Sequence, residues 1–236
     1  MHTSNYIYKQ REQELHGFLA YDENKKCRPA VIVAHDWSGR NDFACQKATM
    51  LAEMGYVGFA LDMFGQARLG STTEEKSALI HPLVSNQELL RQRVRAAFDA
   101  VSTMPEVDSQ RIAIIGFCFG GLCALELARS GAEIKGVVSF HGLLNKPGTM
   151  KTEAIKAKIL ALHGYDDPMV KPEVANAFCQ EMTEEKVDWQ LHVYGLVQHA
   201  FTNPNAHDTQ LGLIYNAVAA KRSWLAMTNF LQEVLI

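Results

Sequence analysis

Short apolar runs alternate with helical stretches along almost the whole 236-residue chain. Most of these runs lack the alternation of a half-exposed strand, which is typical of parallel strands buried on both faces. The apolar runs stand at 30–35, 56–62, 111–117, 134–142, 157–164 and 187–195, and the helical patterns at 42–55, 87–104, 121–131, 171–182 and 210–234. An antiparallel pair of strands is expected before them. This order predicts an α/β fold, with one mostly parallel sheet covered by helices on both faces in a single domain over residues 1–236.

The sharpest strand-to-helix turn is Gly116-Phe117-Cys118-Phe119-Gly120. In parallel sheets, ligands bind beyond the carboxyl ends of the strands, so this turn lies where a site is expected. A nucleophile between two glycines is the pattern of a nucleophile elbow, a strained turn that exposes its central side chain. The dipole of the following helix favours a thiolate at Cys118. The pattern therefore indicates a nucleophilic thiol, although a plain glycine-rich turn fits the same residues.

Two more segments with reactive side chains follow later strands. The stretch "LHGYDDPMV" brings Asp166 and Asp167 after one strand, and "VYGLVQHAFTNP" brings His199 after the last. A carboxylate can orient a histidine, and that histidine can serve as the base for a nucleophile. We therefore predict that Cys118, one of the two aspartates and His199 form a catalytic triad.

The order Cys, Asp, His and several motifs resemble the dienelactone hydrolases, which are α/β-hydrolases with a Cys-His-Asp triad. The motifs are "VIVAHDWSGRNDF", "LAEMGYVGFALDMFG", "RIAIIGFCFGG", "LHGYDDPMV" and "YGLVQHAFTNP". The resemblance implies the α/β-hydrolase fold, with Cys118 as nucleophile and His199 as base. It also implies Asp167 as the orienting acid, because the family acid stands three residues after the glycine that is Gly164 here. Asp166 is the alternative.

The same resemblance implies an oxyanion hole beside the nucleophile. The backbone N–H groups of Phe119 and Trp37 would stabilise the charge that develops in the tetrahedral intermediate. Trp37 could instead serve only as a wall of the pocket. The family has a glutamate that interacts with the resting cysteine, and this sequence has the shorter Asp36 there. We expect that tuning of the nucleophile to be altered.

The expected substrate-binding residues depart from the family. The family's namesake enzyme holds its substrate's carboxylate with two arginines, and this sequence has His81 and Asn203 at those positions. A neutral amide and a mostly uncharged imidazole are poor substitutes for a bidentate arginine. We therefore expect neutral small esters or lactones to be preferred over carboxylated dienelactones. The candidates for a replacement clamp are Arg40, Arg68 and Arg222.

Composition and charge argue against other classes of partner. The formal net charge of −3, without a concentrated basic patch, gives no reason to expect nucleic acid or an anionic membrane. No uncharged apolar run reaches the ~20 residues that span a bilayer, and no signal peptide is recognisable at the N-terminus. The five cysteines are odd in number and lack a CxxC pair, which argues against disulfides and zinc and indicates a cytoplasmic protein. A monomer or homodimer is expected.

The other histidines at strand ends, and Cys123, give weaker indications of a functional role. His35, His141 and His163 each end a strand without metal-ligand spacing, so we expect hydrogen-bonded structural roles for them. Cys123 is expected to pack against the sheet. The function that we predict is hydrolysis of a small ester or lactone through a cysteine acyl-enzyme, without metal or organic cofactor. A thioesterase or acyl transferase with the same triad stays open, as does a non-catalytic ligand-binding or redox-sensing protein.

Overall fold

The structure is a computed structural model that describes residues 1–24 and 27–236. Within these residues, eight strands form one sheet in the order β1-β2-β4-β3-β5-β6-β7-β8, and β9 pairs with β10. The strands are β1 (His2–Gln10), β2 (Gln13–Tyr21), β3 (Arg28–Ala34), β4 (Val57–Ala60), β5 (Val107–Phe117), β6 (Gly136–Phe140), β7 (Lys158–Gly164), β8 (Trp189–Tyr194), β9 (His207–Asp208) and β10 (Leu213–Ile214). The helices are α1 (Asp42–Glu53), α2 (Thr73–Val84), α3 (Gln87–Ser102), α4 (Phe119–Arg129), α5 (Pro172–Glu184) and α6 (Ala217–Leu235).

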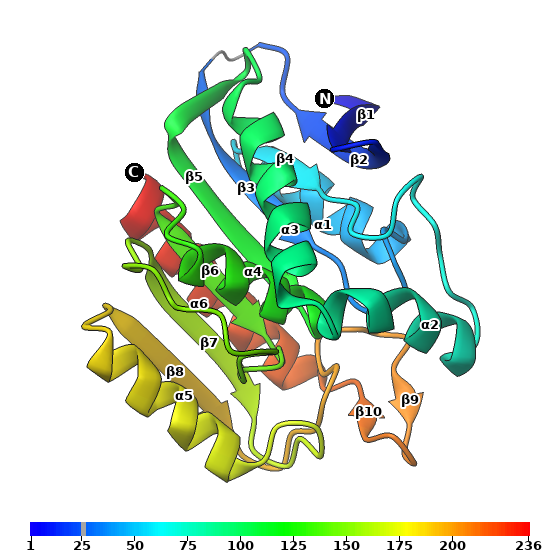
Figure 1. Ribbon diagram of the computed structural model, residues 1–236, viewed down its shortest axis with the longest axis vertical. Helices are drawn as coiled ribbons and strands as arrows, with labels where there is room; N and C mark the ends of the chain where they lie inside the picture. The colour runs from blue at the N-terminus through cyan, green and yellow to red at the C-terminus, as the bar shows by residue number, and fades with distance from the viewer. Residues whose placement is uncertain (25–26) are drawn as a thin grey trace.

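The predicted mostly parallel sheet with helices on both faces is confirmed. Strands β4, β3, β5, β6, β7 and β8 pair in parallel, and β1 and β2 add antiparallel strands at one edge. Successive side chains of a strand point to opposite faces. In β3, Ala30, Ile32 and Ala34 belong to the core formed with α3, α4 and α5, whereas Val31 and Val33 belong to the core formed with α1 and α6. Figure 1 shows these two helical layers.

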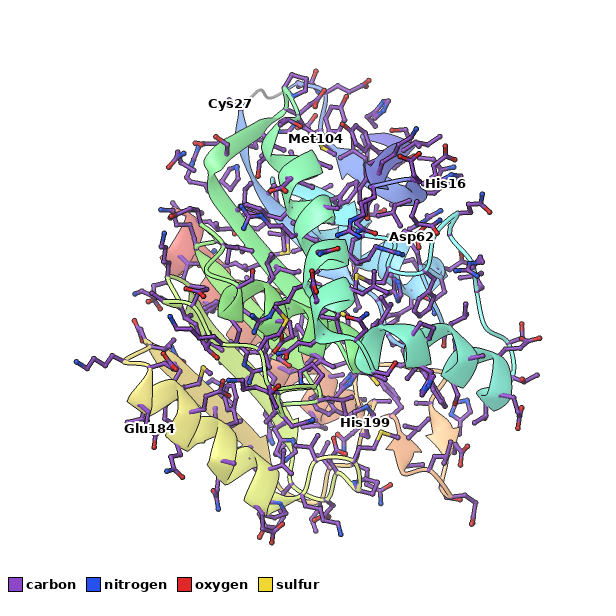
Figure 2. All side chains as sticks on the ribbon, viewed as in Figure 1. His16, Cys27, Asp62, Met104, Glu184 and His199 are labelled. Atoms are coloured by element: carbon purple, nitrogen blue, oxygen red, sulfur yellow. The ribbon has the colours of Figure 1, made fainter. Side chains whose placement is uncertain are left out.

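The carboxyl ends of the parallel strands lie together at one end of the sheet. Cys27 and Met104, which come just before β3 and β5, lie at the end of the molecule opposite His199 (Figure 2). Loops that follow β3, β5, β6, β7 and β8 therefore converge around His199. This is the end at which ligands bind in sheets of this kind.

Two segments beside this end depart from the predicted pattern. The closing helix is predicted from residue 210 but begins at Ala217, where the Asn216 side chain accepts a hydrogen bond from a backbone N–H of the first turn. Residues 207–214 instead form the β9-β10 hairpin. Helix α2 was not predicted, and it begins with a capping box between Thr72 and Glu75. Over the described part of the chain, no helix combines the length and apolarity needed to cross a membrane.

Candidate active site

Cys118 lies at the turn between β5 and α4. Its φ of 54° and ψ of −117° are in a region that residues other than glycine rarely adopt, so the backbone here is strained. Close packing imposes the turn. A Cβ at Gly116 would collide with the carbonyl of Gly120, and a Cβ at Gly120 would collide with the carbonyl of Ala34. The strained central residue and the two tightly packed glycines are the features of a nucleophile elbow.

Asp167 and His199 meet in the loops after β7 and β8. The Nδ1 atom of His199 lies 2.6 Å from Oδ2 of Asp167, and both side chains are fully buried. The other carboxylate oxygen accepts hydrogen bonds from the backbone N–H groups of Met169 and Val170, which fixes its orientation. Asp166, the alternative acid, is exposed. The structure thus brings Asp167 to the histidine, and Asp166 faces solvent.

Cys118 and Asp167 act on the charge of His199. Burial alone lowers the pKa of His199, but Cys118 and the hydrogen bond with Asp167 together raise it to about 10. The Nε2 atom is buried and makes no hydrogen bond of full geometry to any residue that the structure describes. Cys118 is nevertheless the neighbour that raises this pKa most. These contacts favour the charged imidazolium form of His199.

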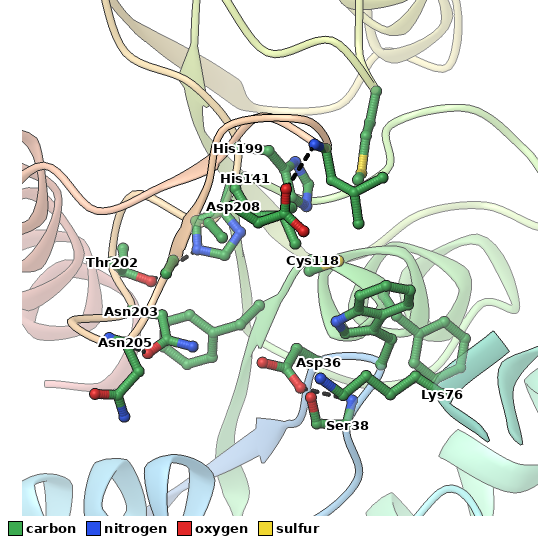
Figure 3. Close-up of a pocket in the computed structure, with 18 of the residues that line it drawn as sticks. Asp36, Ser38, Lys76, Cys118, His141, His199, Thr202, Asn203, Asn205 and Asp208 are labelled. Atoms are coloured by element: carbon green, nitrogen blue, oxygen red, sulfur yellow. Dashed lines mark hydrogen bonds between the residues drawn. The ribbon is translucent and has the colours of Figure 1, made fainter. Parts of the chain in front are cut away.

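A cavity of about 570 Å³ opens in front of Cys118 and His199. Residues 36–38 of the loop after β3 and one side of α2 form part of its wall, and residues 205–208 with the β9-β10 hairpin form another part. Figure 3 shows Asp36 and Lys76 on one side of Cys118, with His199 on the other. The size and the concave shape of this cavity are typical of a site that binds a small molecule.

The structure brings both predicted oxyanion donors to this cavity. Phe119 is the first residue of α4 and Trp37 lies in the loop after β3, and both line the cavity. The first N–H groups of a helix have no intrahelical partner. Neither the Phe119 N–H nor the Trp37 N–H donates to another described residue. Both groups are thus available to a ligand.

Asp36 and Asn203 line the cavity as well, but each side chain already accepts a hydrogen bond from a backbone N–H two residues further along the chain. The Oδ1 atom of Asp36 accepts a hydrogen bond from the Ser38 N–H at 2.8 Å. The Oδ1 atom of Asn203 accepts one from the Asn205 N–H at 2.9 Å. Figure 3 shows both side chains among those that surround the cavity.

His81 is the predicted site residue that the structure places elsewhere. It is exposed near the end of α2 and does not line the cavity, which corrects its assignment to the substrate pocket. The side of α2 that does line the cavity carries Thr73, Lys76, Ser77 and Ile80. These positions have the spacing of one helical face, and the residue after Ile80 is rotated by about 100° away from it.

Lys76 is the site residue that sequence reasoning missed. Among the described residues that line the cavity, it is the single lysine or arginine. Its Nζ atom lies 5.4 Å from the centre of the Trp37 ring, within cation–π range. Arg40 donates to Cys45 and Asn5, outside the cavity. Had α2 been recognised, the helical spacing of its residues would have pointed to Lys76.

The other expected cations lie elsewhere. Arg68 donates to the carbonyl of Phe64. Arg222 is on α6, and neither arginine lines the cavity. None of the three proposed replacement arginines is therefore placed to clamp a substrate next to Cys118.

Three buried histidines lie at the carboxyl ends of β3, β6 and β7. His35 has its Nδ1 atom 2.6 Å from the carbonyl oxygen of Asp36, and His141 has its Nε2 atom 2.7 Å from Oγ1 of Thr202. Burial lowers the pKa of His35, His141 and His163, which favours the neutral form of each imidazole. Within residues 1–24 and 27–236, no group of three histidine, cysteine or acidic side chains could hold a metal ion.

Known proteins share this fold and much of this sequence. A dienelactone hydrolase-like promiscuous phosphotriesterase from metagenomic libraries superposes with a TM-score of 0.94 and is 38% identical, over 100% of this chain and 99% of that one. A Caenorhabditis elegans protein, "Uncharacterized protein K02A2.1", is 37% identical over 147 residues, which are 61% of this chain and 93% of that protein. A Saccharolobus solfataricus protein with the name "Putative carboxymethylenebutenolidase" is 26% identical, and the match covers 97% of this chain and 97% of that one.

The match to a family model extends over nearly the whole chain. The model of the dienelactone hydrolase family covers residues 15–235, which include the elbow, the Asp167 loop and the His199 loop. The structural neighbours are α/β-hydrolases, in agreement with the sheet and its helical layers. The chain therefore belongs to the dienelactone hydrolase family and is an ester or lactone hydrolase.

Proposed function

We propose that the protein cleaves small esters or lactones through a thioester formed on Cys118. The observation that carries this proposal is the position of His199, which is buried against Asp167 and has its pKa raised to about 10 by Cys118. A thiolate next to an imidazolium is the activated form of a cysteine nucleophile. The strained turn presents that sulfur to the cavity.

In the first step, the Cys118 sulfur attacks the substrate carbonyl. The C–S bond forms, and the electron pair of the C=O bond moves to oxygen. The N–H groups of Phe119 and Trp37 would hold this oxyanion, and losing one such donor typically lowers the rate by about 10²–10³-fold. The C–O bond of the ester then breaks, and the leaving oxygen takes the proton from Nε2 of His199.

In the second step, water cleaves the thioester. Neutral His199 takes a proton from the water at Nε2, and the resulting hydroxide attacks the carbonyl carbon. The C–S bond breaks, so that the acid leaves and the Cys118 thiolate again faces a charged His199. Asp167 keeps the Nδ1 proton in place and holds the ring in one orientation throughout.

We propose neutral substrates, because the charged side chains in the cavity do not favour an anion. Beside the proposed thiolate–imidazolium pair of Cys118 and His199, the lining contains one cation, Lys76, and two carboxylates, Asp36 and Asp208. A buried substrate carboxylate without a paired cation costs several kcal/mol. A single lysine beside two carboxylates provides less compensation than a pair of arginines. Neutral esters and lactones require none.

A phosphotriester is the second candidate substrate class. The metagenomic relative that is 38% identical over the full chain is described as a promiscuous phosphotriesterase. A phosphotriester is uncharged and carries a phosphoryl oxygen, which can accept hydrogen bonds from the same N–H groups. Attack by Cys118 would form an S–P bond and expel an alcohol. The cavity can therefore serve both classes with one set of residues.

We also propose the domain organisation, the location and the oligomeric state of the protein. One continuous sheet with a core on each face supports a single domain over residues 1–236. The scattered free cysteines suit a cytoplasmic location. A monomer or a homodimer is proposed, and size-exclusion chromatography with light scattering separates the two.

Mass spectrometry of a quenched reaction tests the mechanism. Incubation with p-nitrophenyl acetate, followed by acid quenching, should leave one acetyl group on the peptide that contains Cys118. Cys179→Ala is the matched control, because Cys179 is also partly exposed but lies on α5. An adduct that persists in Cys118→Ala, or that maps to another residue, would contradict the proposal. Diethyl p-nitrophenyl phosphate tests the second class in the same assay.

A further inference from the structure

His35 makes two hydrogen bonds that together determine where its proton lies. The backbone N–H of Met63 donates to Nε2 of His35 at 3.2 Å, so Nε2 carries no proton. The neutral ring therefore has its proton on Nδ1, which donates to the carbonyl oxygen of Asp36 at 2.6 Å. Burial lowers the pKa of this imidazole, which keeps it in the neutral form. His35 therefore has one stable tautomer.

The Asp36 carbonyl belongs to the same peptide group as the Trp37 N–H. In a trans peptide, the C=O and N–H bonds point in opposite directions, and the described residues contain no cis peptide bond. His35 lies behind the cavity wall and is not among the residues that line it, whereas Asp36 and Trp37 are. A carbonyl held towards His35 consequently turns the Trp37 N–H towards the cavity.

His35 is itself held by neighbours on both sides. Its ring packs against Phe64 with centroids 4.7 Å apart and lies 6.3 Å from the ring of Phe119. Phe119 supplies the second predicted oxyanion donor, and its N–H likewise donates to no described residue. The Gly39 N–H is a weaker second donor to the Asp36 carbonyl, at 3.4 Å. The imidazole is therefore a rigid link between the loop after β4 and the peptide that carries the Trp37 N–H.

We propose that His35 is a positioning residue of the oxyanion hole, which fixes the Asp36–Trp37 peptide so that its N–H faces the reacting carbonyl. This inference rests on the proposed cysteine mechanism. His35 does not touch the substrate, and its effect is confined to steps in which negative charge develops on oxygen. Acylation by an ester is such a step, and alkylation of the thiol at a saturated carbon is not.

Two substitutions separate the two hydrogen bonds of His35. In His35→Asn, the side-chain amide stands near the position of Nδ1, so donation to the Asp36 carbonyl is retained and the bond from Met63 is lost. In His35→Gln, the amide reaches the position of Nε2, so the bond from Met63 is retained and donation to Asp36 is lost. Both variants replace the ring by an amide, which makes them matched controls for packing.

The readout is the burst rate of acylation by p-nitrophenyl acetate, compared with the rate of Cys118 alkylation by iodoacetamide. We expect His35→Gln to lower acylation by about 10²-fold, in the range for loss of one oxyanion donor, while alkylation is unchanged. His35→Asn should keep most of the acylation rate. Equal acylation losses in both variants, parallel loss of acylation and alkylation, or full acylation by His35→Gln would each overturn the proposal.

Nitrogen NMR of ¹⁵N-histidine in the wild-type protein provides a test that needs no variant. We expect a neutral His35 ring with its proton on Nδ1 throughout the neutral pH range. A proton on Nε2 would overturn the proposal even if the variants fail to fold. Absence of any acyl-enzyme in the wild-type protein would instead count against the Cys118 mechanism, so the two failures are distinguishable.

Discussion

The Nδ1 atom of His199 and the Oδ2 atom of Asp167 lie 2.6 Å apart in a fully buried contact. The carboxylate cannot turn away, because its second oxygen accepts two backbone hydrogen bonds. The imidazole is therefore held by its Nδ1 side. Its Nε2 side is left for Cys118 and the reacting groups.

Asp167→Asn should lower kcat/KM for p-nitrophenyl acetate by on the order of 10⁴-fold, because an amide can stabilise the wrong tautomer and no longer stabilises the imidazolium. Asp166→Asn is the matched control, since Asp166 is exposed. It should change the rate little. The reverse order of effects would show that Asp166 is the orienting acid.

Cys118→Ala should abolish ester hydrolysis and preserve the fold, because the thiol is only partly buried at the cavity and its loss removes a single sulfur atom. Cys118→Ser should also be strongly impaired, since a hydroxyl needs a stronger base than a thiol does. Steady-state kinetics measure the losses, and far-UV circular dichroism checks the fold. Near-normal turnover in a folded Cys118→Ala protein would rule out Cys118 as the nucleophile.

The charge of His199 should persist well above neutral pH. Because its pKa is raised to about 10, the imidazolium keeps its proton as the pH rises through 7 and loses it only as the pH rises through about 10. NMR titration of His199 measures this directly. In Cys118→Ala, the inflection should move to lower pH, because the group that raises the pKa most is removed while burial still lowers it. An inflection near the ordinary ~6.5 in the wild-type protein would contradict the ion pair.

Lys76→Met should change how well the protein hydrolyses a charged ester relative to a neutral one. For a matched pair of esters that differ only by a carboxylate, we expect kcat/KM of the anionic ester to fall by about 10-fold, as for the loss of a partly shielded ion pair, with the neutral ester nearly unchanged. Lys9→Met is the control, since Lys9 is exposed on β1 away from the cavity. Wild-type preference for the anionic ester by tenfold or more would contradict the proposed neutral substrates.

Gly120→Ala should destabilise the elbow, because the new methyl group would meet the carbonyl of Ala34 at the end of β3. We expect a loss of about 1–3 kcal/mol in the free energy of unfolding, measured in urea. Gly195→Ala is the control, because its Cβ would have no atom within 4 Å and its φ is not positive. That variant should stay within about 0.5 kcal/mol of wild type. Equal effects of the two substitutions would contradict a tightly packed elbow.

The sequence contained enough information for the sheet and for the placement of the triad residues. Buried parallel strands are continuous apolar runs, and Cys118 and Asp167 follow two of them closely, whereas His199 follows β8, in which apolar and polar residues alternate. Helix α2 escaped detection because its core-facing apolar residues, Leu79, Ile80, Leu83 and Val84, are confined to its second half, and among the described residues only Leu83 is buried. Pro82 also reads as a helix breaker, although it occurs here in the last turn.

The other differences between the prediction and the structure also lie where the sequence pattern is weak. Without α2, nothing in the sequence separates the orientation of Lys76 from that of His81. The hairpin at 207–214 has two-residue strands, which are too short to leave a recognisable alternation. Its polar residues merged with the pattern of α6, whose start depends on the cap at Asn216. Hydrogen bonds such as that of His35 to the Asp36 carbonyl depend on local geometry that residue types do not specify.

The two segments that wall the cavity, α2 and the β9-β10 hairpin, stand outside the alternating framework that positions Cys118, Asp167 and His199 (Figure 1). Helix α2 lies beside the sheet-covering layers and has one buried residue among those described, Leu83, and the hairpin is a separate sheet. Insertions, deletions or exchanges in either segment can therefore reshape the cavity while leaving Cys118, Asp167 and His199 on their supports. The chain thus separates the part of its sequence that is free to diversify towards new substrates from the part that must be kept for chemistry.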